Sequence, residues 1–504
     1  MTELSRRSFM VGSLLAGAGV MAACAGSGSL GGAPVTASSP IVRRLEQQRR
    51  LPGQQVVSAH LTPRPVEVDL GGRIVSTWGY DDNLPGPLIR ARAGDLLRVQ
   101  VDNRLAVPTS VHWHGIALSN DMDGVPGLTQ DPIAAGAAFT YEFTAPHPGT
   151  YFYHSHSGLQ LDRGLYGALV IDDPREPGDY DHDWIVVLDD WLDGAGRTPD
   201  DVAEQLGIGS TTAGGTGDTG MDRMDHGSMG GMDMGEESML SPLLGVAGDV
   251  TYPHFLVNGR VPMDPMVWTA TPRQRVRIRF VNAGADTAFR VALGGHRMRV
   301  THTDGFPVTP RDTEALLIGM GERFDVLVTL GDGVFPLFAQ AEGKNGHALA
   351  IVRTAAGTLP PQTRPDELDR QVLLGADLSP QEQVRLTAKD NDRYLSADMG
   401  GTMSPYRWTL NGRAHPDILP LEVREGQRVR MRLRNMSDMF HPMHLHGHTF
   451  ALVDGGVRKD TVTIRPMRTV EIEFDTDNPG QWALHCHNAY HQEAGMMTTV
   501  SYRT

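Results

Sequence analysis

One strand-like pattern occurs three times in this chain of 504 residues, at positions 92–103, 271–282 and 424–435. Each copy begins as a turn, continues as a run in which apolar residues occupy alternate positions, and ends in Asn. Such alternation is typical of a strand with one buried face. Three copies of one strand unit, far apart in the chain, predict three related β-sandwich domains in tandem.

Composition agrees with an all-β fold. The chain has 58 Gly and 33 Pro, which indicates many turns and therefore many short strands. We see no long amphipathic helical segment, and the length suits about three domains. The formal net charge of −15 argues against a nucleic-acid partner.

The first residues have the features of an export signal. The hexapeptide at 5–10, Ser-Arg-Arg-Ser-Phe-Met, is similar to a twin-arginine motif, and an apolar, small-residue run follows at 11–23. Cys24 ends that run, as in a bacterial lipobox, although Met21 stands where Leu is usual. We therefore predict a Tat and lipoprotein-type signal at 1–24 and a lipid-anchored protein on the outer face of the cytoplasmic membrane. A non-lipidated signal cleaved nearby is the alternative.

The rest of the chain divides into a tether and three domains. The Gly-, Ser-, Ala- and Arg-rich residues 25–54 indicate the tether, and the domains are predicted at 55–175, 176–361 and 362–504. The second domain contains a Met- and Gly-rich segment without periodicity, which we interpret as a long loop at 194–248.

A short stretch near the C-terminus carries three His, one Cys and one Met. In a strand, successive side chains point to opposite faces, so Cys486 points away from His485 and His487. A thiolate together with His491 and Met496 forms the ligand set of a blue-copper electron-transfer site. A lone buried Cys is usually an inert small hydrophobe, but that interpretation does not explain five soft or borderline metal ligands at these spacings. The stretch predicts one metal on the Cys face and another metal site on the His face.

Further His-x-His pairs occur in the first and last domains. Residues 148–156 match residues 479–487, whereas the corresponding residues 333–341 of the middle domain have no His pair. Two pairs from each outer domain would bring eight imidazoles together, enough for three copper ions with sites left open for oxygen. His296 and His302 of the middle domain are then structural. The eight are His112, His114, His154, His156, His444, His446, His485 and His487.

These motifs, in this order, resemble those of the multicopper oxidases, and the resemblance extends from about Val56 to the end of the chain. The likeness is greatest to bacterial copper-resistance oxidases, and in the leader to those of actinobacteria such as mycobacteria. It implies three cupredoxin-like Greek-key domains and a monomer. It also implies one-electron oxidation of a substrate coupled to four-electron reduction of O2 to water.

The resemblance implies four copper ions and assigns a role to each motif. Type 1 copper would be held by one His cluster and the Cys stretch: His441, Cys486 and His491, with Met496 axial. The type 2 ion would take His112 and His444. The two type 3 ions would take His114, His154 and His487, and His156, His446 and His485.

Proton delivery is predicted from loop carboxylates. Asp123 stands in the position of the family's acidic residue near the type 2 copper, although a loop Asp is often only a turn former. After His491 the family often has Glu, where this chain has Gln492. We expect Glu493 to be the substitute.

The Met-rich part of the long loop bears on the substrate. Thioether sulfur selects Cu(I), and this segment lacks the periodicity of a core. The hypothesis is oxidation of Cu(I) to Cu(II) for detoxification, with O2 and Cu(I) or small reducing substrates as partners. A laccase-like phenol oxidase would need an open pocket over His491, and a copper-sequestering protein without turnover would need no His-Cys-His bridge. The candidate Cu(I) residues are Met221, Met224, Met229, Met232, Met234, Met239, Asp438 and Met439.

Overall fold

The structure, a computed structural model, describes residues 30–176, 178–209, 239–359 and 363–504. The predicted signal at 1–24 lies outside these residues. No helix in the described ranges is long and apolar enough to cross a membrane. The short helices are α1 Pro40–Arg49, α2 Pro199–Leu206, α3 Ala489–Glu493, η1 Asn120–Met122, η2 Gly158–Arg163, η3 Asp366–Asp369, η4 Gly375–Asp377 and η5 Glu382–Val384.

The first domain is built from nine strands. They are β1 Val56–Leu61, β2 Pro63–Asp69, β3 Ile74–Tyr80, β4 Gly86–Arg92, β5 Leu96–Asp102, β6 His112–His114, β7 Ala138–Thr144, β8 Gly149–His154 and β9 Tyr166–Asp172. Sheets β1-β5-β7 and β4-β9-β8-β6 contain seven of them, and β2 and β3 pair as a hairpin.

The middle domain has two six-stranded sheets, and a two-stranded β11-β12 ribbon precedes β13. Its strands are β10 His182–Trp191, β11 Leu240–Ser241, β12 Gly245–Val246, β13 His254–Val257, β14 Met266–Thr269, β15 Arg275–Asn282, β16 Phe289–Leu293, β17 Met298–Thr303, β18 Phe306–Thr313, β19 Ala315–Ile318, β20 Arg323–Thr329, β21 Val334–Ala341, β22 His347–Arg353 and β23 Val372–Leu373. The sheet orders are β13-β10-β15-β20-β17-β18 and β14-β22-β21-β16-β19-β23. Because β23 pairs with β19, this domain's sheet extends beyond the predicted boundary at 361.

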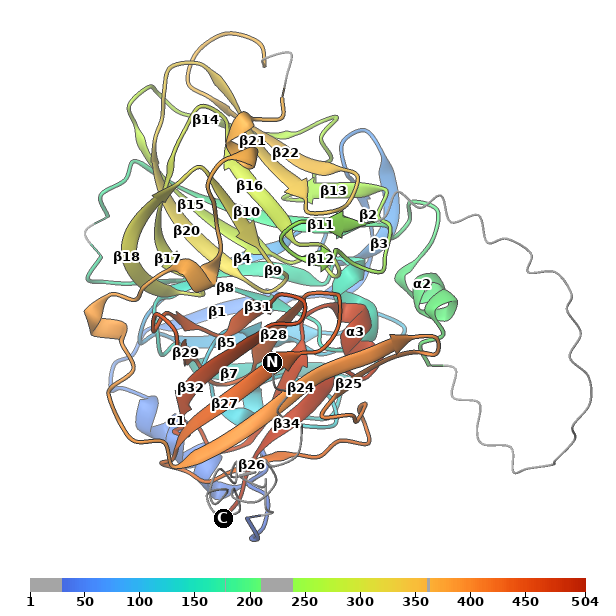
Figure 1. The fold of residues 1–504 in the computed structure, drawn as a ribbon, viewed down its shortest axis with the longest axis vertical. Coiled ribbons are helices and arrows are strands. Elements are labelled where there is room, and N and C mark those ends of the chain that lie inside the picture. The colour runs from blue at the N-terminus through green and yellow to red at the C-terminus, as the bar shows by residue number, and fades with distance from the viewer. Residues whose placement is uncertain (1–29, 177, 210–238, 360–362) are drawn as a thin grey trace, which may run out of the picture.

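The third domain has a six-stranded and a five-stranded sheet. Its strands are β24 Arg393–Met403, β25 Tyr406–Leu410, β26 Leu421–Val423, β27 Arg428–Asn435, β28 His441–Leu445, β29 Phe450–Leu452, β30 Arg458–Lys459, β31 Thr461–Ile464, β32 Thr469–Asp475, β33 Gln481–Cys486 and β34 Met497–Tyr502. The sheet orders are β25-β24-β27-β32-β29-β30 and β26-β34-β33-β28-β31. Figure 1 shows the yellow strands of the middle domain above the orange and red strands of the third. The prediction of an all-β, three-domain fold is confirmed.

The threefold sequence repeat forms the same strand in each domain. Strands β5, β15 and β27 each pair in parallel with the first strand of their domain. The Asn that ends each copy is buried. Its side-chain amide donates to one carbonyl of the following loop and to one of a more distant segment, as Asn103 does to Val107 and Ile133 at 2.9 Å each. Asn282 and Asn435 make the equivalent bonds, so this residue fixes the loop that leads toward each sandwich's other sheet.

The prediction of a tether at 25–54 is wrong for much of that segment. Helix α1 lies within it, with Pro40 in the first turn and Val42 only 1% exposed. Glu46 accepts from the backbone N–H of Thr144 at 2.9 Å, and the Val35 N–H donates to the Tyr502 carbonyl at 2.9 Å. The segment therefore packs on both outer domains, because its few apolar residues fall on one helical face.

The predicted long loop at 194–248 also contains regular structure. Thr198 and Asp201 form a reciprocal capping box at the start of α2. The ribbon of β11 and β12 lies near the other end of the segment. Residues 210–238 lie outside the described part of the chain.

Two buried apolar clusters form most of the core. The larger runs from the middle domain into the third, from Phe280 and Val326 to Trp482 and Leu484. The second fills the first domain around Trp113. The strands that carry the candidate ligands are therefore anchored in continuous cores.

Candidate metal centre

Strands β28 and β33 and helix α3 place three candidate ligands around one point. The Cys486 Sγ lies 3.7 Å from the Nδ1 atoms of both His441 and His491, and these two nitrogens are 3.1 Å apart. Asn488 caps α3 by accepting from the backbone N–H of His491, which fixes the backbone position from which the imidazole extends. Met496 is also fully buried, and its carbonyl accepts from the Cys486 N–H. A thiolate and two imidazoles at this spacing fit copper.

The outer nitrogen of each imidazole in this group has its own partner. His441 Nε2 lies 2.8 Å from the Ser437 hydroxyl, and His491 Nε2 lies 3.0 Å from the Asp249 carboxylate. Such partners fix the tautomer and leave Nδ1 available to a metal. Asp249 was not predicted, because it lies far from every motif in the sequence. Among the described residues Cys486 is the free cysteine, and burial raises the pKa of its thiol.

Strand pairing brings the His-x-His pairs together. In the first domain β6 lies beside β8, with His112 opposite His154. In the third domain β28 lies beside β33, with His444 opposite His485. The eight imidazoles then converge between the two outer domains. His112 stacks on His446 with ring centroids 3.8 Å apart, and His114 stacks on His444 at 3.7 Å.

The eight imidazoles are buried, at 0% to 7% exposure. Several of their nitrogens have no hydrogen-bond partner, including Nε2 of His112, His154, His156 and His444 and both nitrogens of His487. Buried polar atoms normally have partners, so these orphaned atoms indicate a group that the protein atoms do not supply. Burial and neighbouring imidazoles hold the pKa of His154 and His446 well below the usual value. The rings are therefore neutral, as metal ligation requires.

The spacing of the ligand atoms gives several groups that could hold a metal ion. One is His156, His446 and His485, the trio predicted for one type 3 copper. A second joins His112, His114 and His154, with the His487 ring 4.8 Å from that of His114. His112 and His444, the predicted type 2 pair, form a third group with His446. The donor set of neutral imidazoles fits copper.

Asp123 lies where the predicted proton donor should be. It is fully buried, and its two carboxylate oxygens are 3.2 Å and 3.1 Å from His446 Nδ1. Its backbone carbonyl lies 2.8 Å from His112 Nδ1. Asp123 therefore contacts ligands of two metal groups.

A cavity of about 300 Å³ lies beside the His cluster. His156, Ser157, Gln492 and Glu493 are among the residues that line it. Gln492 donates to the Glu493 carboxylate at 3.3 Å. The cavity gives small molecules access to one of the predicted type 3 ligands.

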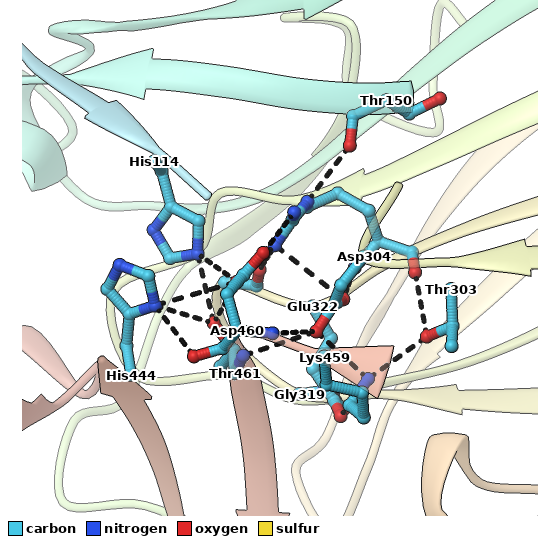
Figure 2. Close-up of polar contacts among 12 residues, drawn as sticks. His114, Thr150, Thr303, Asp304, Gly319, Glu322, His444, Lys459, Asp460 and Thr461 are labelled. Carbon is cyan, nitrogen blue, oxygen red and sulfur yellow. Dashed lines mark hydrogen bonds and ion pairs between the residues drawn. The ribbon is translucent and has the colours of Figure 1, made fainter. Parts of the chain in front are cut away.

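The structure also reveals a charged contact that the sequence did not indicate. Asp460 is fully buried, and its Oδ1 lies 3.2 Å from His114 Nε2. His444 Nδ1 lies 3.0 Å from the Asp460 carbonyl. Figure 2 shows His114 and His444 beside Asp460, with Asp304 and Lys459 beyond it. Asp460 stands in the bend between β30 and β31, where an Asp gives no local signal of this role.

The candidate Cu(I) residues are only partly described. Met221, Met224, Met229, Met232 and Met234 lie outside the described residues. Met239 is described, and its carbonyl accepts from Ala247 at 2.8 Å. Met439 is 3% exposed and packs in the core. Asp438 is exposed, and Ser437, not Asp438, contacts His441.

The middle domain's histidines have structural partners. His296 contacts the Gly294 carbonyl at 2.8 Å and accepts from the Gly331 N–H at 2.9 Å. His302 lies 3.0 Å from the Thr301 hydroxyl. Neither joins a metal-binding group within the described ranges.

Known proteins share this organisation. The chain is 47% identical over 99% of its length to the Multicopper oxidase MmcO of Mycobacterium tuberculosis, of which it covers 97%. It is 30% identical over 87% of its length to a Copper resistance protein A homolog of Pseudomonas syringae pv. tomato, of which it covers 91%. The crystal structure of Fet3p, a multicopper oxidase that functions in iron import, matches with a TM-score of 0.74 and 22% identity, covering 89% of this chain and 90% of that one.

Family models described as multicopper oxidase match residues 64–176, 183–357 and 388–504, one for each domain. Each outer match contains two of the His-x-His pairs, and the middle match contains none. The matched residues span most of the chain, and the chain belongs to the multicopper oxidase family.

Proposed function

We propose that this protein oxidises Cu(I) to Cu(II) for copper detoxification and uses O2 as the final electron acceptor. Copper bound at the two sites would supply one-electron oxidation at the Cys486 site and four-electron reduction of O2 to water at the His cluster. The observation that carries the proposal is the convergence of Cys486, His441 and His491 on one side of β33 and of eight buried imidazoles on the other.

The ligands divide among four ions in the proposal. Type 1 copper takes His441, Cys486 and His491, with Met496 axial, and type 2 copper takes His112 and His444. The first type 3 ion takes His114, His154 and His487, and the second takes His156, His446 and His485. Six of these histidines have an orphaned nitrogen, and five of the six, all except His487, belong to groups that could hold a metal ion, which supports metal binding by the cluster.

The segment from Met239 to Asp249 supports Cu(I) as the substrate. The Val246 N–H donates to the Asp438 carbonyl at 3.1 Å, so the ribbon of β11 and β12 sits on the loop that precedes His441. Asp249 then reaches His491 at 3.0 Å. Met239, the described end of the Met-rich segment, is bonded to this ribbon through Ala247. Thioethers capture Cu(I), and a carboxylate beside His491 suits a cation.

A phenol oxidase is less well supported. A phenol would need to approach His491, whose side chain is fully buried. The Trp408 ring lies 4.2 Å from the His491 ring, and the Tyr406 hydroxyl donates to Asp249 at 2.7 Å. Trp408 and Asp249 thus pack directly against the His491 ring.

Asp123 is the proposed proton carrier at the cluster. Its carboxylate faces His446 Nδ1, and it is enclosed by protein. Gln492 cannot release a proton, so Glu493 at the cavity wall is proposed as the second donor. The cavity also provides the path for O2 and water.

Export and anchoring complete the proposal. The leader at 1–24 supports export by the twin-arginine route, and Cys24 supports a lipid anchor. We place the protein, as a monomer, on the outer face of the cytoplasmic membrane. There it would meet incoming Cu(I).

The test compares steady-state rates with Cu(I) and with a phenol on fully copper-loaded protein. A variant with Met221, Met224, Met229, Met232 and Met234 changed to Leu keeps the segment's length and apolar character. We expect its kcat/KM for Cu(I) to fall about tenfold, because soft sulfur ligands are lost. We expect its rate with the phenol to be unchanged. An unchanged Cu(I) rate would remove the support from the Met-rich segment. Copper loading without O2 consumption would indicate sequestration instead.

A further inference from the structure

The middle domain holds no copper ligand in the proposed function. It nevertheless lies against the trinuclear site, the cluster of eight imidazoles proposed to hold the type 2 ion and the two type 3 ions. The turn between β19 and β20 lies against imidazoles of both outer domains. A Cβ added to Gly321 would lie 2.9 Å from His114 Cε1 and 2.9 Å from His487 Cδ2. Gly321 also has a φ of +80°, so both its conformation and its position require a residue without a side chain.

Arg323 follows this turn and forms a two-point ion pair. Its Nη1 and Nη2 donate to the two Asp460 oxygens at 2.7 Å and 2.6 Å. Its other nitrogens are also used, since Nε donates to the Thr150 carbonyl at 3.1 Å. Arg323 and Asp460 are both 0% exposed. The guanidinium therefore joins the middle domain to both outer domains in one rigid contact.

Gly115 of the first domain leaves room for this pair. A Cβ at this position would lie 2.5 Å from Arg323 Nη2 and 2.6 Å from Asp460 Oδ2. Gly115 directly follows His114 in the first His-x-His pair. The ion pair is therefore packed against the backbone that carries a copper ligand.

Asp460 in turn sets the orientation of two imidazoles. His114 Nε2 lies 3.2 Å from Asp460 Oδ1 and 3.0 Å from the Thr461 hydroxyl, and His114 Nδ1 has no partner. His444 shows the reverse arrangement, with Nδ1 3.0 Å from the Asp460 carbonyl and Nε2 unpartnered. The nitrogen left without a partner is Nδ1 in His114 and Nε2 in His444. The contacts therefore leave opposite ring nitrogens of the two residues available to a metal ion.

Arg323 is the cation that pairs with the Asp460 carboxylate, and both side chains are fully buried. Asp304 and Lys459 extend the network, with Lys459 Nζ 3.1 Å from Asp304 Oδ2, and Asp304 accepts from the Arg323 N–H. The network is buried, so the loss of one partner would leave a charge without compensation.

We propose that Arg323 is a positioning residue of the trinuclear site, which acts by holding the Asp460 carboxylate against His114 and His444. The copper-free middle domain thereby determines which ring nitrogens are presented to the type 2 and type 3 copper ions. This inference rests on the ligand assignment in the proposed function.

The test uses the full-length protein with Arg323→Gln and, as a matched control, Arg277→Gln. Arg277 is a buried arginine of the same domain that ion-pairs with Asp325, and Asp325 keeps Arg279 as a second partner. We measure copper per chain, the type 2 electron paramagnetic resonance signal, and copper affinity by chelator competition. We expect Arg323→Gln to weaken copper binding at the cluster about 10- to 100-fold and to change the type 2 signal, while the blue type 1 absorbance stays. The control should keep both signals.

A second pair of variants keeps the inference falsifiable if Arg323→Gln does not fold. Asp460→Asn preserves shape and removes the charge, and we expect the same loss of cluster copper. Arg323→Lys retains the charge without the two-point geometry and should restore part of the affinity.

Each outcome decides between the two proposals. An unchanged type 2 signal and full cluster copper in Arg323→Gln or Asp460→Asn would overturn the positioning role. Equal loss in the Arg277→Gln control would also overturn it, because general destabilisation would then be the cause. A wild-type protein that binds no cluster copper would instead refute the proposed function.

Discussion

Strands β8 and β33 of the outer domains lead into His pairs, and strand β21 of the middle domain does not. The middle positions that correspond to His485 and His487 are Ala339 and Ala341, both buried in the middle core. The strands occupy the same place in related sandwiches, so the fold alone does not create a metal site. The metal site depends on imidazole-bearing strands of two domains that face each other.

The middle domain nevertheless contacts both sites. Gly321 and Arg323 lie against the His cluster, and Asp249 lies against His491. The comparison indicates that a domain without ligands has been retained as a support for the ligands of the other two. The predictions below test this division of roles.

The largest effect is expected from substitutions at His485 of β33 and at Ala339, the corresponding position of β21. His485→Gln removes an imidazole from the cluster and should lower O2 consumption to below about 1% of wild type. Loss of a residue that only hydrogen-bonds to a metal ligand already lowers metal affinity or activity about 10- to 100-fold, so loss of a ligand should cost more. Ala339→His places an imidazole at the equivalent middle position. It should add no copper and cost about 1–3 kcal/mol of stability through overpacking.

Copper analysis and thermal unfolding distinguish these outcomes. An additional copper ion in Ala339→His would show that the middle domain retains a latent site. That result would break the comparison.

A smaller effect is expected at Asp249. Asp249→Asn keeps the size of the side chain and removes its charge, so kcat/KM for Cu(I) should fall about tenfold, consistent with a charged hydrogen bond of about 1.5–3 kcal/mol. Asp312→Asn is the matched control, because Asp312 is an exposed carboxylate of the same domain and joins no metal-binding group among the described residues. Equal Cu(I) rates in the two variants would exclude Asp249 from substrate oxidation.

The smallest effect concerns pH and the copper-free protein. Burial and neighbouring imidazoles lower the pKa of His156 to about 3, against about 6.5 in the unfolded chain. Between these values the unfolded state binds a proton that the folded state does not. The free energy of unfolding should therefore fall as pH decreases below about 6.5, by about 1.4 kcal/mol per pH unit for each such His.

Urea unfolding at several pH values measures this slope. His156→Gln should flatten this slope by one proton relative to the wild-type protein. An unchanged slope in His156→Gln would contradict the buried, neutral state of this imidazole.

Local patterns in the sequence were sufficient to predict the fold and many of the residues that converge at the two metal sites. Alternation around Asn103, Asn282 and Asn435 predicts the strands, and the spacing of His485, Cys486 and His487 predicts two faces. Strand formation and the face on which a side chain lies both depend on neighbouring residues in the chain. The alternation of side chains between the two faces of a strand therefore predicts both directly.

Long-range partners could not be predicted in this way. Asp249, Arg323 and Asp460 act across domains, and nothing in their immediate sequence indicates a partner. Helix α1 was missed for another reason, since Ser39 and Pro40 give a helix start but the segment is polar overall. Its one buried stripe becomes apparent only against the surface that it covers.

The measurement that tests the account most directly is the spectrum and O2 consumption of a copper-loaded Cys486→Ser variant. The account predicts that this variant loses the blue absorbance and O2 turnover, while the type 2 signal of the His cluster remains. A variant that kept the blue absorbance and still consumed O2 would contradict the assignment of Cys486 and, with it, the proposed division between the two sites.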